Sequence, residues 1–168
     1  DQYIQQWNLG KEGFAVGFID GTNPNTQPYH TAGTRAICYY SAMYRIFNKG
    51  IYRQRGLDTL DYLLNKFDFN SSYYGSPLHN RCYAADALIN AYYVLAGGEP
   101  ALQEKIKFEM NDKIIAWAIA SQTPEGFWPH DRFGHQPGAA PEAKEMGAYS
   151  WGMVMGLEIF NSRIQNSH

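Results

Sequence analysis

The sequence is poor in charge and in cysteine. Charged residues make up only 18% of the 168 residues, against 45% hydrophobic ones, which excludes a disordered chain and predicts a single globular domain, 1–168. The net charge is −2 and no basic run is present, so we expect no nucleic-acid partner. The cysteines, Cys38 and Cys82, lack the spacing of a metal site, and we predict free thiols rather than a disulfide.

Long apolar runs are also missing. No stretch approaches the roughly 20 apolar residues of a membrane span, and no signal-peptide pattern opens the sequence, so we predict no span. The sequence starts at Asp1 without a methionine, which indicates either a processed mature chain or a piece of a longer one. The cellular location is left open, with a periplasmic or secreted protein as one expectation.

Apolar side chains recur at helical spacing through most of the sequence. The segments 31–48, 80–96 and 142–164 are apolar or small on nearly all sides, which predicts inner helices that are buried all round. The segments 51–67 and 100–121 each carry a single apolar stripe, which predicts outer helices. Inner and outer helices therefore alternate along the chain, as in a series of helical hairpins.

A weak internal repeat agrees with this alternation. A shift of the sequence by 49 residues superposes His30 on His79 and keeps the helix classes in phase. Three aromatic loops, 14–30, 69–79 and 127–135, each lead from an outer position into an inner helix. The alternation predicts all three loops at one end of the domain, where we expect the functional site.

Several segments resemble a known group of proteins. They are QTPEGFW (122–128), YHTAGTRAICYYSAMYRIF (29–47), LDTLDYLL (57–64) and EMGAYSWGMVMGLEIF (145–160). The first resembles a motif of α/α-barrel terpene cyclases. Together, in order and in loop chemistry, they resemble the α/α-toroid carbohydrate-active enzymes, especially the unsaturated glucuronyl hydrolases and the polysaccharide lyases.

The resemblance implies an all-α fold of repeated helical hairpins, an α/α toroid or a partial toroid. A closed ring needs about twelve helices and this chain has five or six, so a partner domain or a second copy would cover its open apolar faces.

Two places in the sequence are candidates for acid or base chemistry. The loop 127–135 brings His130, Asp131 and Arg132 together, and such neighbours tune the proton affinity of a carboxylate, so Asp131 is our first choice. The alternative is that these residues cap a turn and form a surface ion pair. Asp86 lies within an apolar inner helix, which predicts either a catalytic role or a bonded partner such as Arg35.

Aromatic and basic residues of the loops and helix starts are candidates for substrate binding. Rings in the loops offer platforms for the C–H face of a sugar, although each ring could instead plug the end of the helical barrel. Histidines and arginines near helix starts suit an anionic ligand such as a uronic acid, although the histidines could also be capping residues. The predicted binding residues are Trp128, Tyr73, Tyr74, His30, His79, Arg35 and Arg132, with Phe14, Phe18 and Arg81 as further candidates.

The sequence therefore predicts a glycoside hydrolase or polysaccharide lyase acting on acidic oligosaccharides, with a second carboxylate from Asp20, Asp86 or Glu145. The alternative is a non-catalytic helical scaffold that binds a glycan or a peptide. A terpene-cyclase-like domain ranks last because the acidic run of those enzymes is missing. No metal or cofactor is expected, because the sequence has neither a zinc-ligand spacing nor a phosphate-binding glycine loop.

Overall fold

The structure, a computed structural model, describes residues 10–12, 30–70, 77–122 and 124. The elements are η1 (Gly10–Glu12), α2 (His30–Phe47), α3 (Gly50–Asn65), α4 (Pro77–Asn90), η2 (Ala91–Leu95), α5 (Pro100–Glu109), η3 (Met110–Ile115) and α6 (Ala116–Ser121). The described residues contain no β-strand, so the predicted all-α class is confirmed for them.

Four of the five predicted helices are present, with ends that agree to within three residues. The largest difference is at the start of α4, which begins at Pro77 because proline fits the first turn of a helix, where its missing N–H costs nothing. The fifth predicted helix, 142–164, lies outside the described residues, as does most of the three predicted loops.

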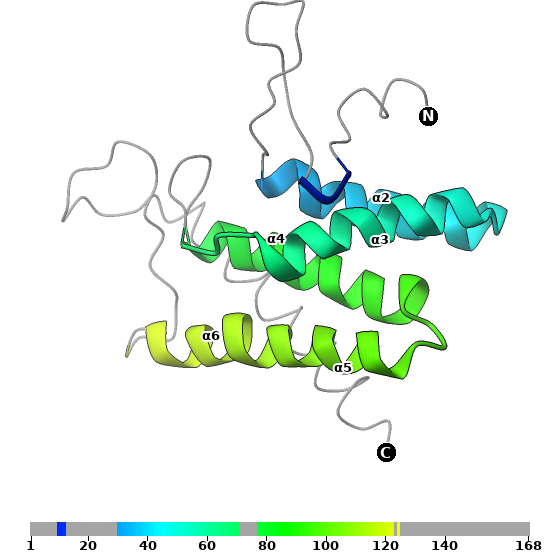
Figure 1. Ribbon diagram of the computed structural model, residues 1–168. Helices are drawn as coiled ribbons and strands as arrows, with labels where there is room; N and C mark the ends of the chain where they lie inside the picture. Colours follow the sequence, from blue (N-terminus) through cyan, green and yellow to red (C-terminus); the bar gives the residue numbers. More distant parts are fainter. Residues whose placement is uncertain (1–9, 13–29, 71–76, 123, 125–168) are drawn as a thin grey trace, which may run out of the picture.

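Apart from η1, two helical hairpins make up the described part of the chain (Figure 1). The first joins α2 to α3 through Asn48 and Lys49, and Asn48 takes a left-handed φ of 49°, which asparagine tolerates better than most residues. The second joins α4 and η2, which run on as one helix, to the continuous helix of α5, η3 and α6. The helices α2 and α4 contact each other and begin at the same end of the described helices (Figure 1).

The core lies between the two hairpins. The apolar stripes predicted for the two outer helices face into it, as Leu60 of α3 is 1% exposed and Met110 of η3 is fully buried. The largest side chains that are nearly or fully buried are Tyr40, Ile37, Leu60, Leu78, Leu88, Leu95, Ile106, Met110 and Ile114. The prediction that each outer helix has one buried apolar stripe and one solvent-exposed face is thus confirmed.

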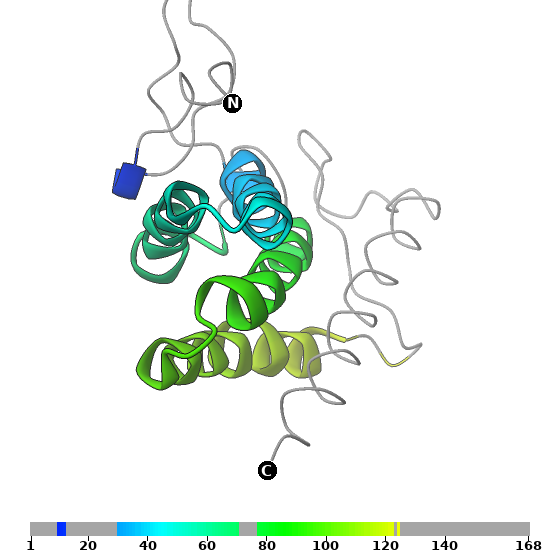
Figure 2. The same ribbon diagram turned by 90° about the vertical axis from the view of Figure 1, so that its right-hand side faces the viewer.

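The two described inner helices are not buried all round, and that prediction is wrong. Arg35, Ala42 and Arg45 of α2 are exposed, and so is Asp86 of α4. The reason is that α3 and α4 cover only part of the surface of α2, and that α2 and η3 cover only part of the surface of α4 (Figure 2). In the described part of the chain, no helix is both long and apolar enough to cross a membrane.

Candidate functional site

Most predicted site residues lie outside the described residues. They are Asp131, His130, Trp128, Arg132, Tyr73, Tyr74, Phe14, Phe18, Asp20 and Glu145. Of the others, His30 is the first residue of α2, and its side chain is not described. Arg35, His79 and Asp86 are described, and the structure brings all three into one cluster, although their predicted roles stay predictions.

An ion pair joins the two inner helices. Nη1 of Arg35 on α2 lies 2.9 Å from Oδ2 of Asp86 on α4, across 51 residues of sequence. Asp86 is thus bonded to Arg35, the partner that the sequence analysis named for it. Both side chains are about half exposed (54% and 50%), so Arg35 remains accessible to a ligand. An exposed ion pair of this kind adds little to the stability of the fold.

Two rings of α4 lie beside this ion pair. The guanidinium carbon of Arg35 is 4.2 Å from the centroid of the Tyr83 ring, within the range of a cation–π contact. The rings of His79 and Tyr83 have centroids 4.5 Å apart, since residues four apart lie on the same face of a helix. One face of α4 thus presents His79, Tyr83 and Asp86 in steps of four and three residues.

Asn90 and Cys38 complete the arrangement around Asp86. Nδ2 of Asn90 donates to the backbone oxygen of Asp86 at 2.8 Å and to its Oδ1 at 3.1 Å, while Sγ of Cys38 lies 3.7 Å from its Oδ2. These contacts fix the carboxylate against Arg35. We call this set of residues the α2–α4 cluster: Arg35, Cys38, His79, Tyr83, Asp86 and Asn90.

The cluster contains one carboxylate. Among the described residues, Asp86 alone of the acids joins it by a hydrogen bond or an ion pair. Hydrolysis of a glycosidic bond by a carboxylate pair needs a second one. In the described residues Asp86 holds Arg35 in place, and its predicted catalytic role stays a prediction that requires a second carboxylate from outside the described residues.

Both cysteines are free thiols, as predicted, and they are half-buried. Burial, with the nearby Asp86 carboxylate as the next cause, raises the pKa of Cys38 from 9.0 to about 12. The Cys38 thiol is thus protonated at neutral pH and is a poor nucleophile.

The raised pKa of Cys38 predicts a pH dependence of stability. The folded chain holds this proton more tightly than the unfolded chain, so the stabilisation is complete below the unfolded pKa and is lost as pH rises toward about 12. We expect the difference in unfolding free energy between the native chain and Cys38→Ser to shrink from about pH 8 to about pH 11. Denaturant unfolding at both pH values measures it, and a difference that grows would contradict the assignment.

Arg81 was a candidate for binding an anion, and the structure shows that this expectation is wrong. Its side chain is 4% exposed, and its N–H groups donate to the backbone oxygens of Lys113 (2.8 Å), Phe69 (2.8 Å) and Pro77 (3.1 Å). Burial lowers the pKa of this guanidinium to about 10. Arg81 is thus a structural clamp between the chain before α4 and η3.

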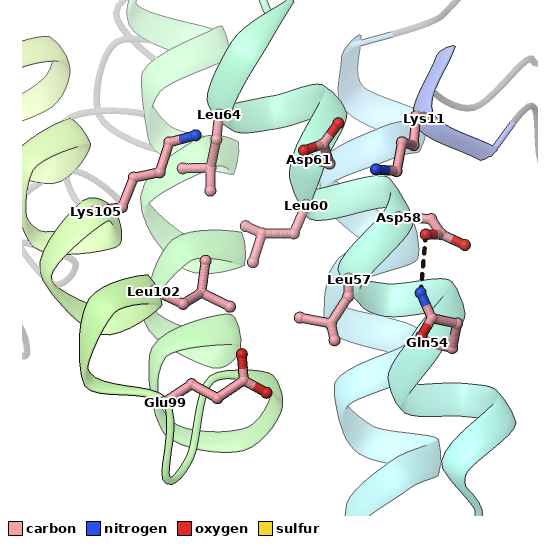
Figure 3. Close-up of a pocket in the computed structure, with 10 residues that line it drawn as sticks. All are labelled: Lys11, Gln54, Leu57, Asp58, Leu60, Asp61, Leu64, Glu99, Leu102 and Lys105. Carbon is pink, nitrogen blue, oxygen red and sulfur yellow. Dashed lines mark hydrogen bonds between the residues drawn. The ribbon is translucent and has the colours of Figure 1, made fainter.

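A pocket lies between α3 and α5, and the sequence did not predict it (Figure 3). It has a volume of about 260 Å³ and an apolar floor, with side chains of both charges at its mouth. The floor consists of Leu57, Leu60, Leu64 and Leu102, and the mouth of Lys11, Gln54, Asp58, Asp61, Glu99 and Lys105. At one edge Lys105 Nζ donates to Oδ1 of Asn65 at 2.8 Å.

The described residues contain no group of three His, Cys, Asp or Glu side chains that could hold a metal ion. Comparison of the chain with family models, with curated proteins and with solved structures finds no match, so the α2–α4 cluster is interpreted from its own geometry.

Proposed function

We propose that this chain is a helical domain of a carbohydrate-active protein, a glycoside hydrolase or polysaccharide lyase for acidic oligosaccharides, and that the α2–α4 cluster binds a uronate carboxylate. The observation that carries the proposal is the half-exposed guanidinium of Arg35, held by Asp86 and stacked on Tyr83. A guanidinium has five N–H donors, and the bond to Asp86 uses only Nη1, so donors remain for a second carboxylate.

Aromatic rings near Arg35 could contact the sugar ring, in addition to the contact between Arg35 and the carboxylate. Tyr83 and His79 place rings beside the guanidinium, and Tyr93, seven residues after Asp86 on the same helix, is 43% exposed. An aromatic ring buries the C–H face of a pyranose at a small cost in side-chain entropy. Two adjacent rings next to a fixed cation are the arrangement expected for an acidic saccharide.

The exposed faces of α2 and α4 also support the toroid hypothesis. In a ring of helical hairpins, the inner helices turn one face toward the central hollow, which would account for polar residues such as Arg35 and Asp86 on helices that are otherwise apolar. Further hairpins, from a partner domain or a second copy, would complete the ring. Asp131, with His130 beside it, remains the proposed acid or base.

Binding measurements with the full chain test the ligand class. We expect a uronate oligosaccharide to bind and its neutral glucose analogue to bind far more weakly. Arg35→Ala should weaken binding of the uronate by about tenfold or more, because a hydrogen bond to a charged group is lost. Arg45→Ala removes another exposed arginine of α2 and should leave the affinity unchanged. Isothermal titration calorimetry measures both, and equal affinity for the two saccharides would exclude the proposal.

Turnover assays with the same oligosaccharides separate an enzyme from a binding domain. Asp131→Asn should abolish turnover and leave the binding that depends on Arg35 intact. Uronate binding without turnover by the native chain would favour the second candidate, a non-catalytic glycan-binding domain. The observation that favours this candidate is the single, fully engaged carboxylate of the cluster.

A further inference from the structure

The turn between α2 and α3 exposes three large apolar side chains. Ile46 is 68% exposed, Phe47 is 51% exposed and Ile51 is 50% exposed, and only Asn48, Lys49 and Gly50 separate Phe47 from Ile51. We call residues 45–51 the apolar tip. It lies at the opposite end of the hairpin from the start of α2, and the chain reverses there (Figure 1). Exposed apolar side chains gathered in one place mark a contact surface more often than scattered ones do.

The charged residues of the apolar tip, and of the sequence on both sides of it, are all basic. Residues 36–57 contain Arg45, Lys49, Arg53 and Arg55, and neither aspartate nor glutamate. Arg53 forms an ion pair with Glu99 of the neighbouring turn. Arg45 and Lys49 are exposed and form no ion pair with any residue that the structure describes. The tip thus combines apolar side chains with uncompensated positive charge.

We propose that the apolar tip docks onto the surface of an anionic lipid bilayer. Apolar side chains flanked by Lys and Arg are the combination that sits at a membrane interface, with the rings and aliphatic groups below the headgroups and the cations among the phosphates. A protruding helical turn needs no matching hollow at a fluid interface, whereas a protein partner would need one. The interaction is peripheral, and it is separate from the α2–α4 cluster and its proposed ligand.

The contributions of the basic and apolar side chains to membrane affinity can be estimated from typical values for such groups. Each basic side chain near an anionic surface raises the affinity about fivefold, and each buried CH₂ group raises it about fourfold. Phe47, Ile46 and Ile51 therefore provide most of the affinity, while Arg45 and Lys49 provide the preference for anionic lipid.

Sedimentation of the full chain with vesicles tests the apolar part of the tip. We expect binding to phosphatidylcholine vesicles that contain about 30 mol % phosphatidylserine, and little binding to phosphatidylcholine alone. Phe47→Asp should lower the affinity by about tenfold or more. The matched control is Phe108→Asp, since Phe108 is 62% exposed but lies on α5, and it should change the affinity less than about twofold.

A second pair of variants tests the charge. Lys49→Gln should lower the affinity about fivefold, whereas Lys66→Gln, at the other end of α3, should leave it unchanged. Absence of binding to anionic vesicles by the native chain overturns the proposal, as does an equal loss in Phe47→Asp and Phe108→Asp. Self-association of the native chain that Phe47→Asp abolishes, without vesicle binding, would instead assign the tip to a second copy and would also overturn it.

Discussion

Replacement of Arg81 by methionine is expected to lower the free energy of unfolding by about 3 kcal/mol or more. The guanidinium donates four hydrogen bonds: to the backbone oxygens of Lys113, Phe69 and Pro77, and to Oδ1 of Asn70 at 3.0 Å. Its carbon also lies 4.4 Å from the centroid of the Trp117 ring. Methionine fills part of the volume, but it leaves the buried backbone oxygen of Phe69 and three partly buried acceptors without their donor.

The control for this variant is Arg45→Met. Arg45 is exposed in the last turn of α2, and its replacement should change the stability by no more than about 0.5 kcal/mol. Urea denaturation followed by circular dichroism measures both variants. Equal stability of the two would show that the Arg81 clamp does not hold the start of α4 to η3.

Replacement of Gly56 by valine is expected to destabilise the chain by about 2–3 kcal/mol. A Cβ atom at this position would lie 2.7 Å from Cδ1 of Leu95 and 3.2 Å from Cβ of Tyr40. Leu95 and Tyr40 are fully buried, so a shift of the Leu95 methyl groups away from the new side chain would have to be accommodated by the packed core. Gly56 is therefore the position where α3 approaches both α2 and η2 most tightly among the described glycines.

Gly50→Val serves as the control, since Gly50 begins the same helix and a Cβ there would meet no atom within 4 Å. Valine and glycine differ little in helix propensity, so this variant should shift the stability by no more than about 0.5 kcal/mol. Thermal and denaturant unfolding compare the two glycines. A loss at position 50 as large as that at position 56 would contradict the packing of α3 against η2.

The helices of the described part could be predicted from the sequence because their signals are local. Leu60, Leu64 and the stripe from Leu102 to Ile114 repeat at helical spacing, and Gly97 and Gly98 separate the second pair of helices. A partner for Asp86 was predicted from the cost of a buried acid, and the partner is present although the Asp86 side chain is half exposed, so burial is not the reason for the pair. Arg35 was the expected partner, and it is the one found.

The remaining features depend on packing between distant segments. Nothing in the sequence near Arg81 shows that its side chain reaches Lys113, 32 residues later. The composition of α2 and α4 could not show which part of each helix its neighbours cover, and so both helices were predicted to be buried all round although Arg35 and Asp86 are exposed. The pocket between α3 and α5 was missed because Leu57, Leu64 and Leu102 read as ordinary core positions.

The central claim is that the α2–α4 cluster binds a uronate through Arg35. The most direct measurement follows the Nε–Hε resonance of Arg35 in the full chain by NMR during titration with a uronate oligosaccharide, with the neutral glucose analogue as the comparison. We predict a saturable shift with the uronate and none with the neutral saccharide. An unchanged Arg35 resonance, while other resonances shift with the uronate, would contradict the claim.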